Sequence, residues 1–116
     1  MQEPPPNSDP ACLHPVFREK VRSLLDSLNA EGILFRLFEG FRSLERQQYL
    51  YAHGRAGWNS YHRYGLAADF ALSEENAGNW RRLREIAEQL GLVTSSFELG
   101  HVQLAGLKSE DLAVAA

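Results

Sequence analysis

The stretch SYHRYGLAADFAL, residues 60–72, decides the fold and the chemistry that this chain can support. It places an imidazole, His62, and a carboxylate, Asp69, around a glycine turn that leads into an apolar strand. Further on, Glu98 and His101 add a carboxylate and a second imidazole, three residues apart. Two imidazoles favour zinc over calcium or magnesium, and a catalytic zinc site has three protein ligands and an open position for water. The sequence therefore predicts His62, Asp69 and His101 as metal ligands.

Alternating side chains give each strand of this predicted site two different faces. In residues 66–72 one face carries the larger apolar side chains, and the other carries Asp69 between two alanines. In residues 100–104 the same alternation puts His101 and Gln103 on one face and two apolar side chains on the other. Both strands therefore have a core face and a chemical face.

Glu98 has two interpretations beside that ligand set. As a fourth ligand it would close a structural site, whereas beside an open site it would act as a general base. Its offset of three residues from His101 lets both side chains approach one point from different directions, which favours the base. In that role Glu98 would take a proton from the zinc-bound water and pass it to a leaving amine.

Four further residues are candidates for substrate contacts. Arg42 lies at a predicted junction of strand and helix, from which its guanidinium could reach a substrate carboxylate or a developing oxyanion. An ion pair on the surface explains Arg42 almost as well. Ser60, Tyr61 and Gln103 could orient the metal ligands or contact substrate, or could be ordinary strand and turn residues.

Composition indicates one globular domain. The chain has 116 residues, of which 44% are hydrophobic and 23% charged, close to globular averages. Residues 1–14 are rich in proline and predict a flexible lead-in, so the domain is expected over residues 15–116. A net charge of −3 without a basic run argues against nucleic acid, and the lack of a long apolar run argues against membrane insertion. We expect a monomer.

Apolar periodicity predicts the remaining elements. Helices are expected from Pro15 to a stop at Gly32, after Ser43 through residue 52, and over an apolar stripe that runs from residue 80 to residue 90. The nearly continuous apolar run at residues 33–38 predicts a strand buried on both faces. A short strand or turn is expected within residues 92–99, and a last helical turn from residue 109.

The motifs resemble the M15 metallopeptidases, which cleave peptidoglycan and include D-alanyl-D-alanine carboxypeptidases and phage L-alanyl-D-glutamate endolysins. The family pattern SxHxxGxAxD is matched by Ser60, His62, Gly65, Ala67 and Asp69, and the later acidic-x-x-His pattern by Glu98 and His101. The upstream part of the endolysin branch resembles residues 40–43, 47, 50–51 and 54–55.

The resemblance implies an α+β fold of the hedgehog and D-Ala-D-Ala-peptidase type, with a small antiparallel sheet flanked by helices. It implies zinc on His62, Asp69 and His101, Glu98 as base, and Arg42 as a binder of substrate or transition state. The implied substrate is the stem peptide of bacterial peptidoglycan. Residues 97–104 look most like the phage endolysin ending, which favours the L-alanyl-D-glutamate bond.

A bacteriolytic phage enzyme would be made in the host cytoplasm without a signal peptide and would reach the wall after holin-mediated release, which fits the start of this sequence. Two other functions stay open. The loop between Arg55 and Ser60 is shorter than expected for the endolysin branch, so the chain could be a non-catalytic cell-wall-binding or virion module in which metal only stabilises the fold. It could also be a D,D-carboxypeptidase or dipeptidase.

Overall fold

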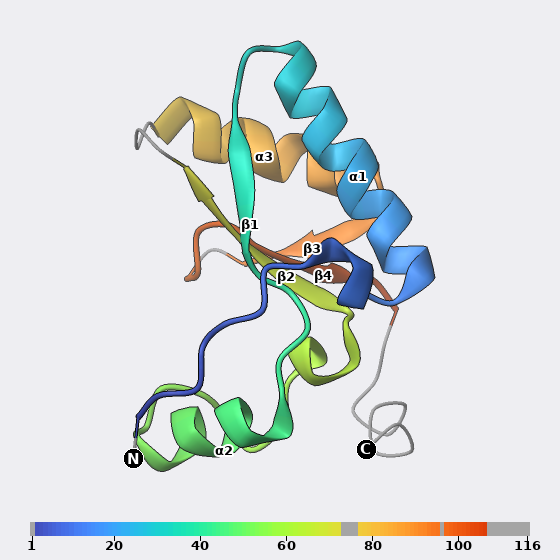
Figure 1. The fold of residues 1–116 in the computed structure, drawn as a ribbon. Coiled ribbons are helices and arrows are strands. Elements are labelled where there is room, and N and C mark those ends of the chain that lie inside the picture. Colours follow the sequence, from blue (N-terminus) through green and yellow to red (C-terminus); the bar gives the residue numbers. More distant parts are fainter. Residues whose placement is uncertain (1, 73–76, 96, 107–116) are drawn as a thin grey trace.

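The computed structural model describes residues 2–72, 77–95 and 97–106, and the helical turn expected from residue 109 lies outside them. Three α-helices, four strands and two short 3-10 helices make up the described chain (Figure 1). In chain order these are η1 (Pro10–Cys12), α1 (Pro15–Ala30), β1 (Phe35–Glu39), α2 (Leu44–Ala52), η2 (Tyr61–Tyr64), β2 (Ala67–Leu72), α3 (Ala77–Gln89), β3 (Leu92–Thr94) and β4 (His101–Leu104).

The four strands form one antiparallel sheet in the order β1-β2-β4-β3. The central strand β2 brings Asp69 opposite Glu39 on β1 and opposite His101 on β4. Three ionisable side chains therefore lie in one row across the sheet. The predicted α+β fold with a small antiparallel sheet is confirmed.

The core lies between the sheet and the helices α1 and α3, which pack against each other on one side of it (Figure 1). Helix α1 begins where Pro15 occupies the first turn and the His14 ring accepts a hydrogen bond from the amide of Val16. Its apolar stripe buries Phe17, Val21, Leu24 and Leu28, each worth about 1.5–3 kcal/mol when fully buried. The strands contribute Ala68, Phe70 and Val102.

The strand β1 corrects one expectation. The sequence predicts a strand buried on both faces, but Arg36 and Phe38 are exposed, Phe35 and Leu37 are half-buried and Glu39 is buried. The prediction is wrong because α1 and α3 both pack on one side of the sheet, so the helices cover only one face of β1.

The segment before α1 lies against the domain. Leu13 is buried in the core, and the carbonyl of Asn7 accepts a hydrogen bond from the amide of Gly40. The amide of His14 donates to the carbonyl of Gly65, whose φ of 69° only glycine adopts readily. A Cβ at Gly65 would lie 2.7 Å from the His14 nitrogen, so this glycine lets the segment pass close to the turn before β2. Among the described residues, no helix is long and apolar enough to cross a bilayer.

Candidate metal centre and active site

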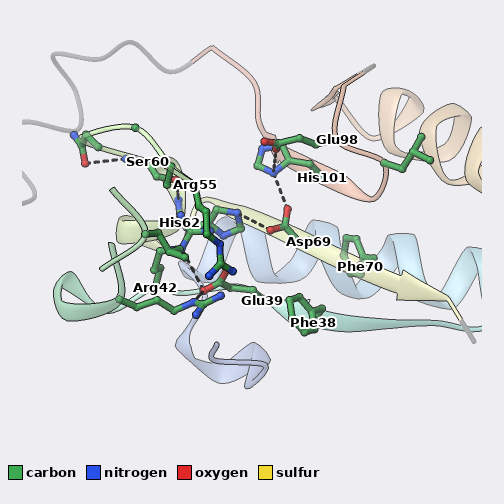
Figure 2. Close-up of a pocket in the computed structure, with 16 residues that line it drawn as sticks. Phe38, Glu39, Arg42, Arg55, Ser60, His62, Asp69, Phe70, Glu98 and His101 are labelled. Atoms are coloured by element: carbon green, nitrogen blue, oxygen red, sulfur yellow. Dashed lines mark hydrogen bonds and ion pairs between the residues drawn. The ribbon is translucent and has the colours of Figure 1, made fainter. Parts of the chain in front are cut away.

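Three side chains from three separate elements converge at one end of the sheet. His62 comes from η2, Asp69 from β2 and His101 from β4, and their ligand atoms all lie within 4.8 Å of one another. The structure therefore brings together all three residues that the sequence predicts as metal ligands. Figure 2 shows the carboxylate of Asp69 between the two imidazole rings.

Local structure fixes the position of each of these side chains. Ser60 caps η2 by accepting a hydrogen bond from the amide of His62, which sets the start of that turn. The carbonyl of Gly100 accepts from the amide of Phe70, next to Asp69. Gly100 has a φ of 84°, and a Cβ there would lie 2.5 Å from the Phe70 carbonyl oxygen. Glycine at this position therefore allows the close approach of the chain that enters β4.

Each imidazole presents one ring nitrogen to Asp69 and has the other held by a fixed oxygen. Nε2 of His62 lies 3.2 Å from Asp69 Oδ2, and Nδ1 of His101 lies 2.8 Å from Asp69 Oδ1. The remaining nitrogens lie 2.8 Å from the Gly40 carbonyl oxygen and 2.9 Å from Gln103 Oε1, respectively. The Gly40 carbonyl and Gln103 Oε1 accept hydrogen bonds from the nitrogens beside them and so hold the two rings in place. A bound metal would replace the protons on the nitrogens that face Asp69.

Electrostatics keep the Asp69 carboxyl in the charged form. Burial acts to raise its pKa, but hydrogen bonds with His101 and His62 outweigh burial and hold the pKa well below its usual range. Burial acts to lower the pKa of His101, and its hydrogen bonds with Asp69 and Gln103 outweigh that effect and raise it. A ligand carboxylate must be deprotonated, and that of Asp69 is ionised at neutral pH.

The donor set fits a zinc ion. Two imidazole nitrogens and one carboxylate oxygen are typical zinc ligands, and three protein ligands leave a fourth position open. These residues line a cleft of about 480 Å³ together with Glu98 and Arg42 (Figure 2). The cluster is thus accessible to a substrate from that cleft.

Glu98 lies at the mouth of the cleft rather than in the cluster of three. Its side chain is 71% exposed, and its Oε2 lies 3.6 Å from Nδ1 of His101. At that distance the carboxylate is next to the cluster and still free to meet a ligand from solvent. The placement is compatible with the base role that the sequence predicts, and that role stays a prediction.

Arg42 lies in the wall of the cleft, and its guanidinium is held by protein groups. It donates two hydrogen bonds to Glu39 and one to Gln47, and its side chain is 9% exposed. Its carbonyl accepts from Arg63. That Arg42 contacts substrate stays a prediction. The structure shows that its side chain is already fixed in place by these bonds.

The three predicted orienting residues occupy different environments. Gln103 accepts from the His101 ring, and Ser60 lines the cleft where it caps η2. Tyr61 packs against the hydrophobic core. Gln103 thus contacts the ring of one predicted metal ligand, His101, and Ser60 contacts the backbone amide of another, His62.

A buried ion cluster beside the cleft was not found by sequence reasoning. Glu39 is 2% exposed and binds both Arg42 and Arg46, and Arg46 is 4% exposed. The one available signal was the position of Glu39, a carboxylate at the end of an apolar strand run, with arginines three and seven residues later. Such a charge is almost never buried unless it is paired.

Comparison with known proteins gives a relative that is similar in sequence. The chain is 35% identical over 107 residues to the peptidoglycan L-alanyl-D-glutamate endopeptidase CwlK of Bacillus subtilis strain 168. The match covers 71% of this chain and 64% of the relative, so the chain spans less than two thirds of the relative's length. No family model matches the chain.

Solved structures share the fold at low sequence identity. The L-Ala D-Glu endopeptidase ChiX of Serratia marcescens has a TM-score of 0.65 at 20% identity, covering 89% of this chain and 86% of its own. The vancomycin resistance D,D-pentapeptidase VanY from a VanB-type cassette, solved with Zn(II), has a TM-score of 0.66 at 18% identity, covering 90% and 79%. These likenesses establish the fold of this chain.

Proposed function

Because the chain belongs to the M15 family of metallopeptidases, we propose that it is a zinc-dependent peptidase that hydrolyses an amide bond in the stem peptides of bacterial peptidoglycan. The observation that carries this proposal is the convergence of His62, Asp69 and His101 at the base of an open cleft. The relative of known activity, CwlK, supports the class of substrate.

In the proposed reaction His62, Asp69 and His101 hold the zinc ion, with Gln103 and the Gly40 carbonyl fixing the two rings. Zinc, when bound, supplies a Lewis acid that lowers the pKa of water and polarises the scissile carbonyl. Glu98 accepts the proton of the attacking water and delivers it to the leaving amine, a role that fits an exposed carboxylate 3.6 Å from His101.

Arg42 is proposed to bind the carbonyl oxygen as negative charge develops there. Three of its five N–H groups bond to Glu39 and Gln47, which leaves two for a substrate. Because those bonds fix the guanidinium in advance, little reorganisation is needed when charge appears on the oxygen. Ser60 and Tyr61 are proposed to support the same site through the turn that carries His62.

The bond that we propose is L-alanyl-D-glutamate. Two relatives named for that activity support it, one in sequence and one in fold. A D,D-peptidase is the competing specificity, since VanY shares the fold to a similar degree. All three proposed ligands come from one chain, which supports a monomer as the active form.

We also propose that the enzyme acts in lysis, as a phage-type endolysin that reaches the wall through a holin lesion. The likeness of residues 97–104 to the phage endolysin ending supports this role. Cells that express the chain should lyse when a holin is co-expressed and remain intact without it. Lysis without holin would instead indicate an export route carried by the chain itself.

The experiment is digestion of purified peptidoglycan followed by mass spectrometry of the soluble products. Zinc-loaded protein should release fragments whose masses identify an L-alanyl-D-glutamate cut, and chelated protein should release none. The variant Glu98→Gln should keep zinc and lose turnover, whereas His62→Ala should lose both. Wall binding without fragments from verified zinc-loaded protein, on walls of several chemotypes, would favour a non-catalytic binding module, and a D-alanine product would identify a D,D-peptidase.

A further inference from the structure

An acidic residue from the start of the chain binds two arginines of the cleft. Arg46 and Arg55 both line the cleft that contains the metal-ligand cluster. The carboxylate of Glu3 uses Oε2 to accept from Arg46 Nη1 at 2.9 Å and Oε1 to accept from Arg55 Nη1. The carbonyl of Pro4 accepts from the same Arg46 nitrogen. Two guanidinium groups thus clamp one carboxylate from two sides.

Apart from Glu3, Arg46 and Arg55 have little pairing with carboxylates in the cleft wall. Among the described residues, Glu39 is the one lining carboxylate bonded to arginine, and it already binds Arg42 and Arg46. When Glu3 is left aside, Arg42 and Arg46 share the buried Glu39, and Arg55 has no carboxylate partner among the described residues. A second carboxylate is the group that this charge distribution favours.

Glu3 itself is well suited to leave that position. Its side chain is 35% exposed and that of Arg55 is 52% exposed, so solvent reaches the pair. Few hydrogen bonds tie residues 2–8 to the rest of the described chain: besides the Pro4 bond, the Asn7 carbonyl accepts from Gly40. Hydrogen bonds from Arg55 and Arg46 lower the pKa of Glu3 to about 2, so its carboxylate is charged at any pH near neutral.

We propose that Arg46 and Arg55 form a carboxylate-binding subsite for the substrate and that Glu3 occupies this subsite in the free protein as an intramolecular competitor. The inference rests on the proposed function, from which it takes the substrate class. A D-glutamyl residue has two carboxyl groups, and one stays free when the other is joined to the next residue of the stem peptide. That free carboxylate, close to the scissile bond, is the ligand proposed for the arginine pair.

The competition has a predictable size. When a fraction of the protein has its site occupied internally, the apparent Kd rises in inverse proportion to the free fraction. Exposed ion pairs are weak, so Glu3 is expected to raise the apparent Kd by only about threefold to tenfold. Glu3→Gln should therefore tighten binding by that factor, because the amide has no charge with which to compete.

The test is calorimetric titration of zinc-loaded protein, in a Glu98→Gln background that prevents turnover. Two synthetic stem peptides are compared, one with the free D-glutamyl carboxylate and one with that group as a primary amide. Glu3→Gln should tighten binding of the first peptide and leave the second unchanged. Arg55→Gln should weaken the first at least threefold and leave the second unchanged. Glu19→Gln, which removes an exposed carboxylate paired with Arg22 on α1, is the matched control and should change neither.

Equal shifts for the two peptides, or no shift in either variant, would overturn the subsite. Weaker binding of both peptides by Glu3→Gln would also overturn it, because the segment would then serve only to support the cleft. The proposed function is judged separately by cleavage. Cleavage by the parent protein without these binding shifts refutes the subsite alone, and the shifts without any cleavage refute the peptidase alone.

Discussion

Replacing Glu39 with glutamine removes the one negative charge that lies buried between Arg42 and Arg46. Glu39 accepts three hydrogen bonds from these two guanidinium groups, and its side chain is 2% exposed. Removing one partner of a buried ion pair lowers the free energy of unfolding by about 3–5 kcal/mol, since the remaining charge stays buried without a partner. Glutamine still offers one acceptor oxygen, so we expect Glu39→Gln to lower the free energy of unfolding by about 3 kcal/mol.

That loss can be converted to a melting temperature. With an unfolding entropy of about 2.1 cal/mol/K per residue, a chain of 116 residues loses about 12 °C in Tm for about 3 kcal/mol. The measurement is thermal unfolding followed by circular dichroism. The control is Glu31→Gln, which breaks a solvent-exposed pair with Arg82 and should cost no more than about 1 kcal/mol.

The same pair predicts how the difference depends on pH. Burial acts to raise the pKa of Glu39, but its bonds with Arg42 and Arg46 outweigh burial and lower the pKa. A carboxyl whose pKa is lower when folded stabilises the fold at pH values above its unfolded pKa, near 4.5, and loses that contribution as pH falls through the folded pKa. The difference in unfolding free energy between the parent protein and Glu39→Gln should therefore be largest at pH 7 and decrease below about pH 4.5. This reasoning would be refuted if Glu39→Gln cost no more stability than the control Glu31→Gln. It would also be refuted if the difference from the parent protein stayed the same down to pH 3.

Three more outcomes follow from the site and the turns. Gly100→Ala should lower the free energy of unfolding, measured with denaturant, by about 2 kcal/mol or more, because the new Cβ would lie against a carbonyl oxygen. The control Gly91→Ala has a φ of 78° and open space around it, so it should lower that free energy by about 1 kcal/mol. Gln103→Leu should weaken zinc binding about 10–100-fold, measured by competition with a chromophoric chelator. The control Gln48→Leu, on the exposed side of α2, should leave zinc affinity unchanged. Equal zinc affinities in the two variants would show that Gln103 does not hold the His101 ring. Zinc at a hundred times its Kd should raise stability by about 2.7 kcal/mol in the parent, and His62→Ala should remove that gain; a zinc shift that survives the substitution would place the metal elsewhere.

Local patterns were enough to predict the two strands that carry Asp69 and His101. Strand alternation over residues 66–72 and 100–104 separated the core face from the face of Asp69 and His101, and the antiparallel register places those two residues opposite each other. The pattern was reliable because the core face of each strand is covered by the packed helices, which fixes the side toward which every second side chain points.

Long-range charge pairing could not be predicted in the same way. The apolar run in β1 does not reveal an edge strand, since the order of strands in a sheet depends on contacts between distant segments. The binding of Glu3 to Arg46 and Arg55 joins residues that are 43 and 52 positions apart. Nothing in the residues around Glu3 specifies these partners, and a proline-rich stretch predicts only an extended chain.

Turnover measured against bound zinc tests the central claim most directly. Metal-free protein is titrated with zinc while hydrolysis of a synthetic stem peptide is followed by mass spectrometry, beside Glu98→Gln under the same conditions. The account predicts that activity rises in proportion to zinc up to one equivalent, and that Glu98→Gln binds the same equivalent without turnover. Hydrolysis that is independent of zinc, or full activity in Glu98→Gln, would contradict it.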